Sequence, residues 1–378
     1  MSHETKMTGV LSFSSLYAVM ARRRRRWYRA HPDARRTLHR PVISVGNIAV
    51  GGRRKTPIVA ALARWLIEKG ERPAILSRGY AREQPRDGVV VVRDAERVLA
   101  PLTEAGDEPF LLAQNLTGCA VVVCADRYLA GRLAESRLGC TVHLLDDGFQ
   151  HFALARDVDL VAVDPQDVTA ARVLPHGRLR ESPDVLDVAD ALIWLGAAHD
   201  TARDRPSDNE LRPPQFIARD RHGVPRPLAS SLGVPALAPP ARVVGVAATA
   251  EPERFFDHLR AAGWALTDAL GFPDHHPFSQ QDLGRVATRM QETGAVAVLT
   301  TEKDGVRLDA RGELPFPAAV VPLAVDIEPR EAFFSWLAGK LEAAGHKVPV
   351  GRGLEAPRPA AAERPCATSR SRSGGSVR

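Results

Sequence analysis

Short apolar runs alternate with longer amphipathic segments from residue 41 to residue 200. Apolar runs bounded by turn residues are typical of buried strands, and apolar positions three and four apart are typical of helices. Their alternation at this spacing predicts a mostly parallel α/β sheet. The expected strands are 41–45, 73–77, 89–92, 120–124, 141–145, 158–163 and 191–195, and the expected helices are 56–69, 106–116 and 127–138.

The pattern changes after residue 200. Residues 201–240 are rich in Pro, Arg and Asp with weak periodicity, which predicts an interdomain linker or a hairpin. A smaller α/β domain is expected over 241–350, and a disordered tail over 351–378, where Pro, Ala, Arg, Ser and Gly dominate. The smaller domain's expected elements are strands 241–247, 295–300 and 318–325 and helices 252–262 and 280–293.

The first 40 residues form a separate segment. Its apolar run, 9–21, would be about 20 Å long as a helix, which is too short to cross a hydrocarbon core of about 30 Å. The arginines at 22–26 follow this run and no small-residue cleavage site comes next, so a signal peptide is not indicated. With Trp27, Tyr28 and Arg29 beyond them, residues 9–29 predict a helix lying in a membrane interface. A helix packed on the protein beneath solvated arginines is an equal alternative.

Composition and charge narrow the class of protein. At 44% hydrophobic and 25% charged residues, the 378-residue chain is neither globally disordered nor a polytopic membrane protein, and its length favours two domains. Its formal charge of +6 lies at the ends: residues 1–40 carry ten Lys/Arg against two Asp/Glu, and 352–378 six against two. The body is therefore acidic, which argues against nucleic acid as a partner and for a basic end that meets anionic lipid. Four cysteines without paired spacing indicate neither zinc nor disulfides and fit a reducing cytoplasm.

The turn after the first expected strand, VGNIAVGGRRKTP at 45–57, has the make-up of a phosphate-binding loop. Such a loop needs glycines that free backbone N–H groups, a Lys for the outer phosphates and a hydroxyl for Mg²⁺ at the helix start. These places are held by Gly51, Gly52, Lys55 and Thr56. The strict pattern fails at Ala49 and at Arg54, where a positive φ would cost a side chain about 1 kcal/mol. The loop predicts a P-loop-type domain, with a basic turn as the alternative.

A second candidate site ends the expected strand 141–145, where Asp146 and Asp147 precede Gly-Phe-Gln-His. A carboxylate at the carboxyl end of a strand beside a phosphate loop is where a second group supporting Mg²⁺ belongs. One such Asp alone would be read as a helix N-cap. The pair with its polar continuation favours a functional site.

The chain resembles a known family, the tetraacyldisaccharide 4′-kinases of lipid A biosynthesis, over nearly all of residues 8–345. The N-terminal LSFSSLY, with the Arg and aromatic residues after it, also looks like that family's membrane-associating segment. The most specific motifs are SRGY (77–80), GDEP (106–109), ADR (125–127), DDGFQH (146–151), LPHGRLRE (174–181), PERFF (252–256), FPDHH (272–276) and TEKD (301–304).

The resemblance implies a P-loop domain and a smaller α/β domain that face each other across a cleft and are joined by a β linker. It implies transfer of the γ-phosphate of ATP, with Mg²⁺, to the 4′-hydroxyl of a tetraacyl glucosamine disaccharide 1-phosphate. The expected location is the cytoplasmic face of the inner membrane of Gram-negative bacteria. The partners implied are therefore this lipid A precursor and the membrane surface.

The resemblance also implies roles for single residues. Lys55 would contact the β- and γ-phosphates and Thr56 the Mg²⁺, while Asp126 matches the catalytic Asp and His275 the His that pairs with it across the cleft. An Asp oriented by a His can accept the proton of a sugar hydroxyl. By spacing alone, Asp126 could equally be an N-cap, and His275 is not separable from His276. The metal and nucleotide would be surrounded by Asp146, Asp147, Gln150 and His151.

Further basic and acidic residues are candidates for the substrate or the metal. Arg78 and Tyr80 follow an expected strand at the end where ligands of α/β sheets collect. The 1-phosphate or the metal shell is the expected partner of Arg178, Arg180 and Glu181. Lys303 and Asp304 follow a strand of the smaller domain and could reach the nucleotide. Solvated surface or a salt-bridged turn is the alternative for each of these.

Arg54 is the main departure from the family, whose members carry Gly before the Lys. One hypothesis is that its guanidinium replaces backbone contacts to ATP and the enzyme stays active. A second is a catalytically impaired paralogue that still binds lipid. A third is a P-loop kinase of a soluble small molecule, which leaves the apolar, Arg-flanked N-terminus unexplained.

Overall fold

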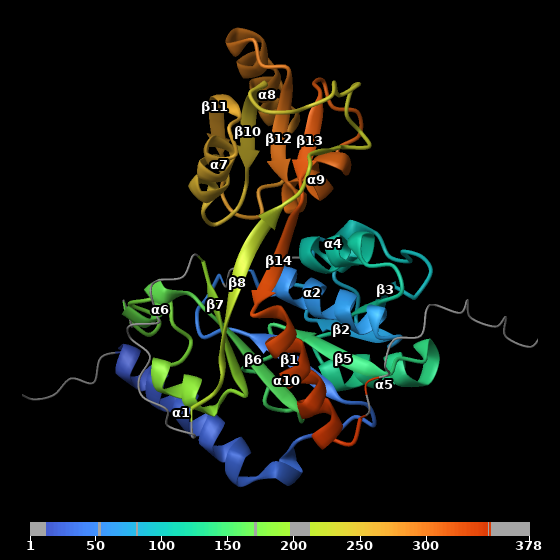
Figure 1. Cartoon of the computed structure of the whole chain (residues 1–378), viewed down its shortest axis with the longest axis vertical. Helices are drawn as coiled ribbons and strands as arrows, with labels where there is room; N and C mark the ends of the chain where they lie inside the picture. Colours follow the sequence, from blue (N-terminus) through green and yellow to red (C-terminus); the bar gives the residue numbers. More distant parts are fainter. Residues whose placement is uncertain are drawn as a thin grey trace, which may run out of the picture.

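The structure is a computed structural model that describes residues 13–51, 54–80, 82–169, 172–196, 212–346 and 348. It contains one large sheet and one small sheet, stacked along the long axis of the molecule (Figure 1). The expected α/β class, with a mostly parallel sheet domain and a smaller α/β domain, is confirmed. Gly52, the expected tail at 351–378 and residues 1–12 lie outside the described residues.

The large sheet has the strand order β14-β8-β7-β6-β1-β5-β2-β4-β3. Its six inner pairings, from β8 to β4, are parallel, whereas β3 and β14 join the two edges antiparallel. The strands are β1 (Val42–Gly46), β2 (Pro73–Ser77), β3 (Val90–Arg93), β4 (Ala120–Val123), β5 (Val142–Asp146), β6 (Val158–Val163), β7 (Ala191–Leu195), β8 (Gln215–His222) and β14 (Leu323–Glu328).

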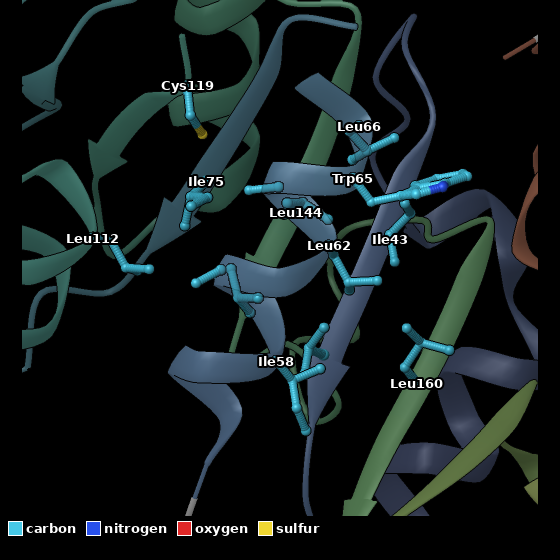
Figure 2. Packing of buried hydrophobic residues seen from close by; sticks show 14 of the residues in the cluster. Ile43, Ile58, Leu62, Trp65, Leu66, Ile75, Leu112, Cys119, Leu144 and Leu160 are labelled. Carbon is cyan, nitrogen blue, oxygen red and sulfur yellow. The ribbon is translucent and has the colours of Figure 1, made fainter. Parts of the chain in front are cut away.

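Helices cover both faces of this sheet, which explains why its central strands are apolar throughout. One face is covered by α2, whose Leu62 and Leu66 are fully buried over β1 and β5 (Figure 2). Trp65 of the same helix stacks on Phe334 of α10, with ring centroids 4.9 Å apart. The helices of this domain are α2 (Lys55–Glu68), α3 (Leu102–Ala105), α4 (Asp107–Asn115), α5 (Arg127–Leu138), α6 (Pro165–Thr169) and α10 (Arg330–Ala343), with the 3-10 turns η1 (Pro32–Ala34) and η2 (Pro183–Val188).

The small sheet has the order β11-β10-β12-β13-β9 and its own apolar core. Its four longer strands pair in parallel, and only the two-residue β9 is antiparallel. The elements are β9 (Arg226–Pro227), β10 (Arg242–Ala247), β11 (Ala265–Gly271), β12 (Ala297–Thr301), β13 (Ala318–Val321), α7 (Pro252–Ala261), α8 (Gln280–Thr293) and α9 (Glu302–Asp309).

The border between the domains differs from the expected one. The single strand expected at 318–325 is interrupted at Pro322, which has no N–H to donate to a ladder, and its two halves belong to different sheets. β14 pairs along its whole length with β8, and α10 buries Phe333, Phe334 and Leu337 in the core of the large domain. The end of the expected smaller domain therefore returns to the first domain. Together β8 and β14 form the connection between the two bodies (Figure 1).

Helix α1 (Phe13–Ala30) lies across one end of the large domain (Figure 1). Among the described residues, no helix is both long enough and apolar enough to cross a membrane. Four large apolar or aromatic side chains of α1 stay exposed, whereas Tyr28 packs its ring 5.8 Å from that of Phe152. The exposed set is Tyr17, Val19, Met20 and Trp27. The helix thus has one face on the protein and an apolar, basic face toward solvent.

Candidate active site

A cleft of about 2000 Å³ lies between the two domains. The first domain lines it with residues that follow its strands, including Lys55 and Asp146, and the second domain with His275 and Lys303. Tyr17 and Met20 of α1 line it as well. In open α/β sheets, ligands bind beyond the carboxyl ends of the strands, which is where this cleft lies.

The predicted phosphate loop connects β1 to α2 and opens into the cleft. Gly51 has a φ of 70°, which glycine adopts without strain, and α2 begins at Lys55. The Lys55 side chain is only 9% exposed, and its Nζ lies 2.7 Å from Oδ1 of Asp147. Thr56 follows in the first turn and lines the cleft. The N-terminus of α2 and the Lys55 ammonium therefore converge on one place, as anion binding requires.

Arg54 occupies the left-handed region that the sequence predicted to be costly there, with φ 62°. Its guanidinium reaches Asp220 of the connecting strand β8, with Nη2 2.5 Å from Oδ2. The side chains of both residues are largely buried, at 13% and 23% exposed. Arg54 therefore binds the linker of the two domains and does not fold back into the loop.

Arg54→Gly is expected to lower the melting temperature by a few degrees while kcat stays within about threefold of the native value. Removing the strain gains about 1 kcal/mol, but it strands the half-buried Asp220 carboxylate, which costs more. Adding Asp220→Asn should recover the lost stability. Thermal unfolding with steady-state kinetics checks this, and a tenfold rise of kcat in Arg54→Gly would show instead that the arginine obstructs the loop.

The DDGFQH turn is packed directly against the phosphate loop. β5 pairs with β1 so that Asp146 stands opposite Val45, and the chain then turns back over β1. A Cβ placed on Gly46 would lie 2.4 Å from Cβ of Phe149, so this close approach requires glycine. The contact holds both loops at one edge of the sheet.

The pKa values of the two aspartates of the turn are shifted in opposite directions. Burial, aided by the charge of Glu108, raises the pKa of Asp146. Burial also acts on Asp147, but Lys55 and Arg180 outweigh it and hold the pKa of that carboxyl below its usual value. Arg180 Nη1 lies 2.9 Å from Oδ2 of Asp147. Asp147 is thus an ionised bridge between two cations that face the cleft.

Glu181 was expected to be a metal ligand, but in the structure its carboxylate forms an ion pair with Arg25 of α1. Nε and Nη2 of Arg25 each donate to one carboxylate oxygen at 2.7 Å, and both side chains are buried. Gln150 also donates to Glu181, at 3.2 Å. Arg25 itself is the exception in the run 22–26, which was expected to face lipid headgroups, because it points inward.

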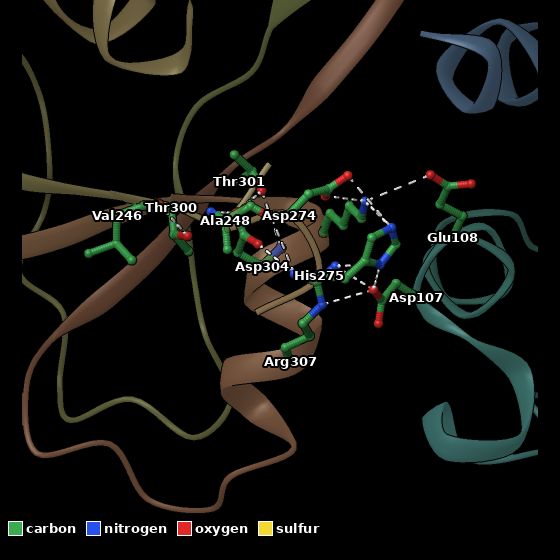
Figure 3. Close-up of polar contacts among 11 residues, drawn as sticks. Asp107, Glu108, Val246, Ala248, Asp274, His275, Thr300, Thr301, Asp304 and Arg307 are labelled. Carbon is green, nitrogen blue, oxygen red and sulfur yellow. Dashed lines mark hydrogen bonds and ion pairs between the residues drawn. The ribbon is translucent and has the colours of Figure 1, made fainter. Parts of the chain in front are cut away.

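His275 faces the cleft from the second domain and pairs with Asp107 at the start of α4. Its Nδ1 lies 2.9 Å from Oδ2 of Asp107, which also accepts from Nε of Arg307 at 2.8 Å (Figure 3). An ionised carboxylate only accepts, so Nδ1 carries the proton and Nε2 accepts from Lys303 Nζ at 3.2 Å. Although burial opposes it, hydrogen bonds from His275 and Arg307 lower the pKa of Asp107 to about 2. The pair therefore carries a full negative charge on Asp107 at neutral pH.

Backbone strain marks the same place. Among the described residues, the non-glycine positions with positive φ are Arg54, Asp147 and His275, and all three line the cleft. Such conformations persist only where the surroundings over-determine them, and they cluster at functional sites. The strain supports the assignment of this cleft as the active site.

The expected pairing of Asp126 with His275 is wrong. Asp126 is the N-cap of α5, where Oδ1 accepts from the backbone N–H of Tyr128 at 3.0 Å. Both carboxylate oxygens also accept from Arg36, at 2.7 and 2.8 Å. The N-cap alternative left open by the sequence is therefore the observed role, and Asp107 of GDEP takes the place beside His275.

The remaining predicted residues divide between the cleft and other surfaces. Arg78, Tyr80 and His151 line the cleft, with the Tyr80 ring centroid 6.1 Å from that of His275. Burial, with the charge of Arg127, lowers the pKa of His151 to about 4, so this ring is neutral at physiological pH. Arg178 instead pairs with Asp167, at 3.2 Å, outside the cleft lining.

Of Lys303 and Asp304, the two TEKD residues expected to reach the nucleotide, only Lys303 lines the cleft. Asp304 is fully buried and accepts from the backbone N–H of Ala248 at 2.9 Å and from Thr301 Oγ1 at 2.7 Å. It also accepts from Arg307 at 3.0 Å. Asp304 therefore holds Arg307 behind the Asp107–His275 pair, and its expected reach to the nucleotide is not observed.

Mg²⁺ was expected on Thr56, Asp146, Asp147 and Glu181. Across the part of the chain that the structure describes, no group of three or more His, Cys, Asp or Glu side chains is arranged to hold a metal ion. Mg²⁺ commonly keeps several waters and is held by one or two carboxylates with substrate phosphates. Thr56 and the buried Asp146 both line the cleft, and a cation would offset the cost that raises the pKa of Asp146. These two residues fit a magnesium–nucleotide complex.

Three residues of this site were missed by reasoning from the sequence: Asp107, Arg307 and Arg25. The signal for Asp107 was present, because GDEP places an acidic residue after a glycine at the start of a helix. Gly106 indeed has a φ of 85°. For the roles of Arg307 and Arg25 the sequence holds no local signal, since Asp107 and Glu181 lie 200 and 156 residues away from them.

Comparisons with known proteins show which family this chain is similar to. A model of the family described as tetraacyldisaccharide-1-P 4′-kinase matches residues 8–342. The tetraacyldisaccharide 4′-kinase of Pelobacter propionicus is 38% identical over 302 residues, which cover 79% of this chain and 82% of the relative. That of Anaeromyxobacter dehalogenans strain 2CP-C is 41% identical over 285 residues, 71% of this chain and 72% of the relative.

A solved structure is similar in fold as well. LpxK from Aquifex aeolicus, crystallised in complex with ATP, superposes with a TM-score of 0.69 at 29% identity. The match covers 88% of this chain and 98% of that one. The resemblance drawn from the eight motifs is therefore confirmed. This chain belongs to the tetraacyldisaccharide-1-P 4′-kinase family.

Proposed function

We propose that this kinase transfers the γ-phosphate of ATP to the 4′-hydroxyl of a tetraacyl glucosamine disaccharide 1-phosphate. The observation that carries the proposal is the cleft itself, which has a phosphate loop on one wall and, facing it, His275 hydrogen-bonded to Asp107 of α4. Phosphoryl transfer needs few parts: cations on the phosphates and a group that orients and deprotonates the acceptor. Both are present.

The first domain supplies the positive charge. Lys55, at the start of α2, is placed for the outer phosphates of ATP, and Arg180 lies beside it through their shared partner Asp147. Mg²⁺, held by Thr56 and Asp146, would neutralise charge on the phosphate oxygens when it is bound. The repulsion between ATP and the acidic DDGFQH turn would then be offset by three cations, Lys55, Arg180 and Mg²⁺.

The second wall supplies the base. A sugar hydroxyl is a weak nucleophile, so a positioned group must take its proton as attack on the phosphorus develops. His275 presents Nε2 to the cleft, and Asp107 fixes the ring and stabilises the charge that forms on it. Lys303, within 3.2 Å of Nε2, is placed to follow the transferred phosphoryl group. Arg307 keeps Asp107 ionised.

The same assignment accounts for α1 at the mouth of the cleft. Met20 and Tyr17 line the cleft and are also exposed, at 63% and 38%, so a lipid acceptor can enter from a surface on which this helix lies. We propose peripheral docking to the cytoplasmic face of the inner membrane through this helix and its arginines. A soluble small-molecule acceptor would not explain the exposed apolar and basic face of α1.

The direct test is transfer of radiolabelled phosphate from ATP to the disaccharide 1-phosphate in detergent micelles. Transfer should depend on added Mg²⁺ and should stop when the acceptor lacks its 4′-hydroxyl. Native enzyme with no more transfer than an Asp107→Ala variant would refute the proposed reaction. Transfer to a soluble sugar at a comparable rate would favour the small-molecule alternative.

Replacing Met20 and Trp27 together by Gln is expected to weaken binding to anionic vesicles about tenfold or more. Each exposed side chain contributes on the order of 1 kcal/mol when it enters the interface. Sedimentation with vesicles of mixed zwitterionic and anionic lipid measures the effect. Val224→Gln, a change at an exposed apolar position of 79% exposure away from α1, is the matched control. Equal binding by the double variant would contradict docking through α1.

A further inference from the structure

One arginine of the run 22–26 differs from its neighbours. Arg25 is 8% exposed, whereas the four others are exposed. It shares the inward face of α1 with Ala21 and Tyr28, which lie four residues before and three after it and are both partly buried. Helical periodicity therefore divides the five arginines into two groups: Arg25 points into the protein, and the other four point to solvent.

Two aromatic rings and a carboxylate surround the buried side chain of Arg25. Its guanidinium lies 4.2 Å from the ring centroid of Phe149 and 4.7 Å from that of Phe152, both in or beside the DDGFQH turn. Its two donors meet the two oxygens of Glu181 at 2.7 Å each. A buried ion pair is costly unless its geometry is good, and the planar fork of arginine matches a carboxylate where lysine does not.

From Glu181 a continuous chain of hydrogen bonds leads to the phosphate site. Gln150 Nε2 donates to Glu181 Oε1 at 3.2 Å and to the backbone oxygen of Asn47, in the phosphate loop, at 2.9 Å. Oε1 of Gln150 accepts from Arg180 at 3.2 Å. Arg180 in turn holds Asp147, which holds Lys55 at 2.7 Å.

We propose that Arg25 is a positioning residue of the phosphate site. By fixing Glu181 it fixes the Gln150 amide, and through that amide both the loop backbone and Arg180. The inference rests on the proposed function, because it takes ATP as the ligand of this site. It assigns α1 a second role: besides docking, the helix holds the phosphate-binding residues in place from behind.

The test measures ATP affinity by calorimetry in the full-length protein, without lipid, so that docking does not enter. Arg25→Gln is expected to weaken ATP binding about fivefold, a change typical of residues that act through a network. Arg25→Lys should recover part of the loss, since it restores the charge without the fork. Arg289→Gln, which removes an exposed ion pair with Asp268 in the second domain, should bind ATP like the native protein.

A vesicle-sedimentation arm separates the two roles of the run. Arg25→Gln should bind anionic vesicles like the native protein, whereas Arg26→Gln, on the exposed side, should bind them more weakly. ATP affinity unchanged in Arg25→Gln, or a loss of vesicle binding equal to that of Arg26→Gln, would overturn the proposal.

Should Arg25→Gln fail to fold, the pair replacement Arg25→Met with Glu181→Leu removes the network without leaving a buried charge. Its ATP affinity should fall at least as far, measured without Mg²⁺ so that any metal contact of Glu181 does not contribute. An affinity equal to that of the native protein would refute the positioning role. If the native protein itself fails to bind ATP, the proposed function is refuted. If the native protein binds ATP and the variants bind it equally well, only the positioning role of Arg25 is refuted.

Discussion

Asp107→Asn is expected to lower kcat by about 10²- to 10⁴-fold with a small change in the KM for ATP. The amide keeps the shape of the side chain but loses the charge that stabilises His275 as it takes the hydroxyl proton, and that is the range over which a positioned base contributes. Because Arg307 lies against the same oxygen, the variant also removes one of the two carboxylate partners of this largely buried cation and leaves it only Asp304. Melting temperature should therefore be recorded beside the kinetics.

The matched control is Asp126→Asn, in the motif that the family resemblance had indicated. Its amide oxygen can still cap α5, and the side-chain partner of Asp126 is Arg36, whereas that of Asp107 is His275. Activity should stay within a few-fold of the native value. If Asp126→Asn loses activity as far as Asp107→Asn does, the pairing seen in the structure is not the catalytic one.

Lys55→Met should lower kcat/KM for ATP by about 10²- to 10³-fold, which is the usual cost of removing a preorganised charge from developing negative charge. Methionine preserves most of the length of the side chain, so the buried position stays filled. The effect should fall on kcat as well as on KM, since charge on the transferring phosphoryl group grows in the transition state.

Thr56→Val offers the comparison for Lys55→Met. It keeps the shape of the side chain and removes only the hydroxyl, so its loss should shrink as the Mg²⁺ concentration rises. The loss in Lys55→Met should not depend on Mg²⁺. An equal dependence in both variants would contradict the separate roles given to the ammonium and the hydroxyl.

Much of the fold follows from local pattern. Each expected strand of the first domain is observed near its expected position, because a buried parallel strand needs a continuous apolar run and little else. The domain border was missed at Pro322 because both halves of 318–325 are equally apolar. Only the available partner, β8, determines that the second half joins the large sheet.

The candidate site divides in the same way. Lys55, Asp146 and Asp147 were predictable because the ends of adjacent parallel strands must meet at one edge of the sheet. Asp107 and Asp126 look alike from the sequence, since each lies at the start of a helix. They differ because α4 packs against α9 of the second domain, whereas α5 packs on β2 and β4 of the first.

By itself, then, the sequence determined the α/β class, the phosphate loop, the paired aspartates and the family of this kinase. These depend on periodicity and on short motifs, which act within a few residues. The tertiary structure alone decided that Asp107 meets His275, that Arg54 binds Asp220 and that one arginine of five turns inward to Glu181. Each of these contacts joins residues more than 150 positions apart, and only strand order and helix packing bring such residues together.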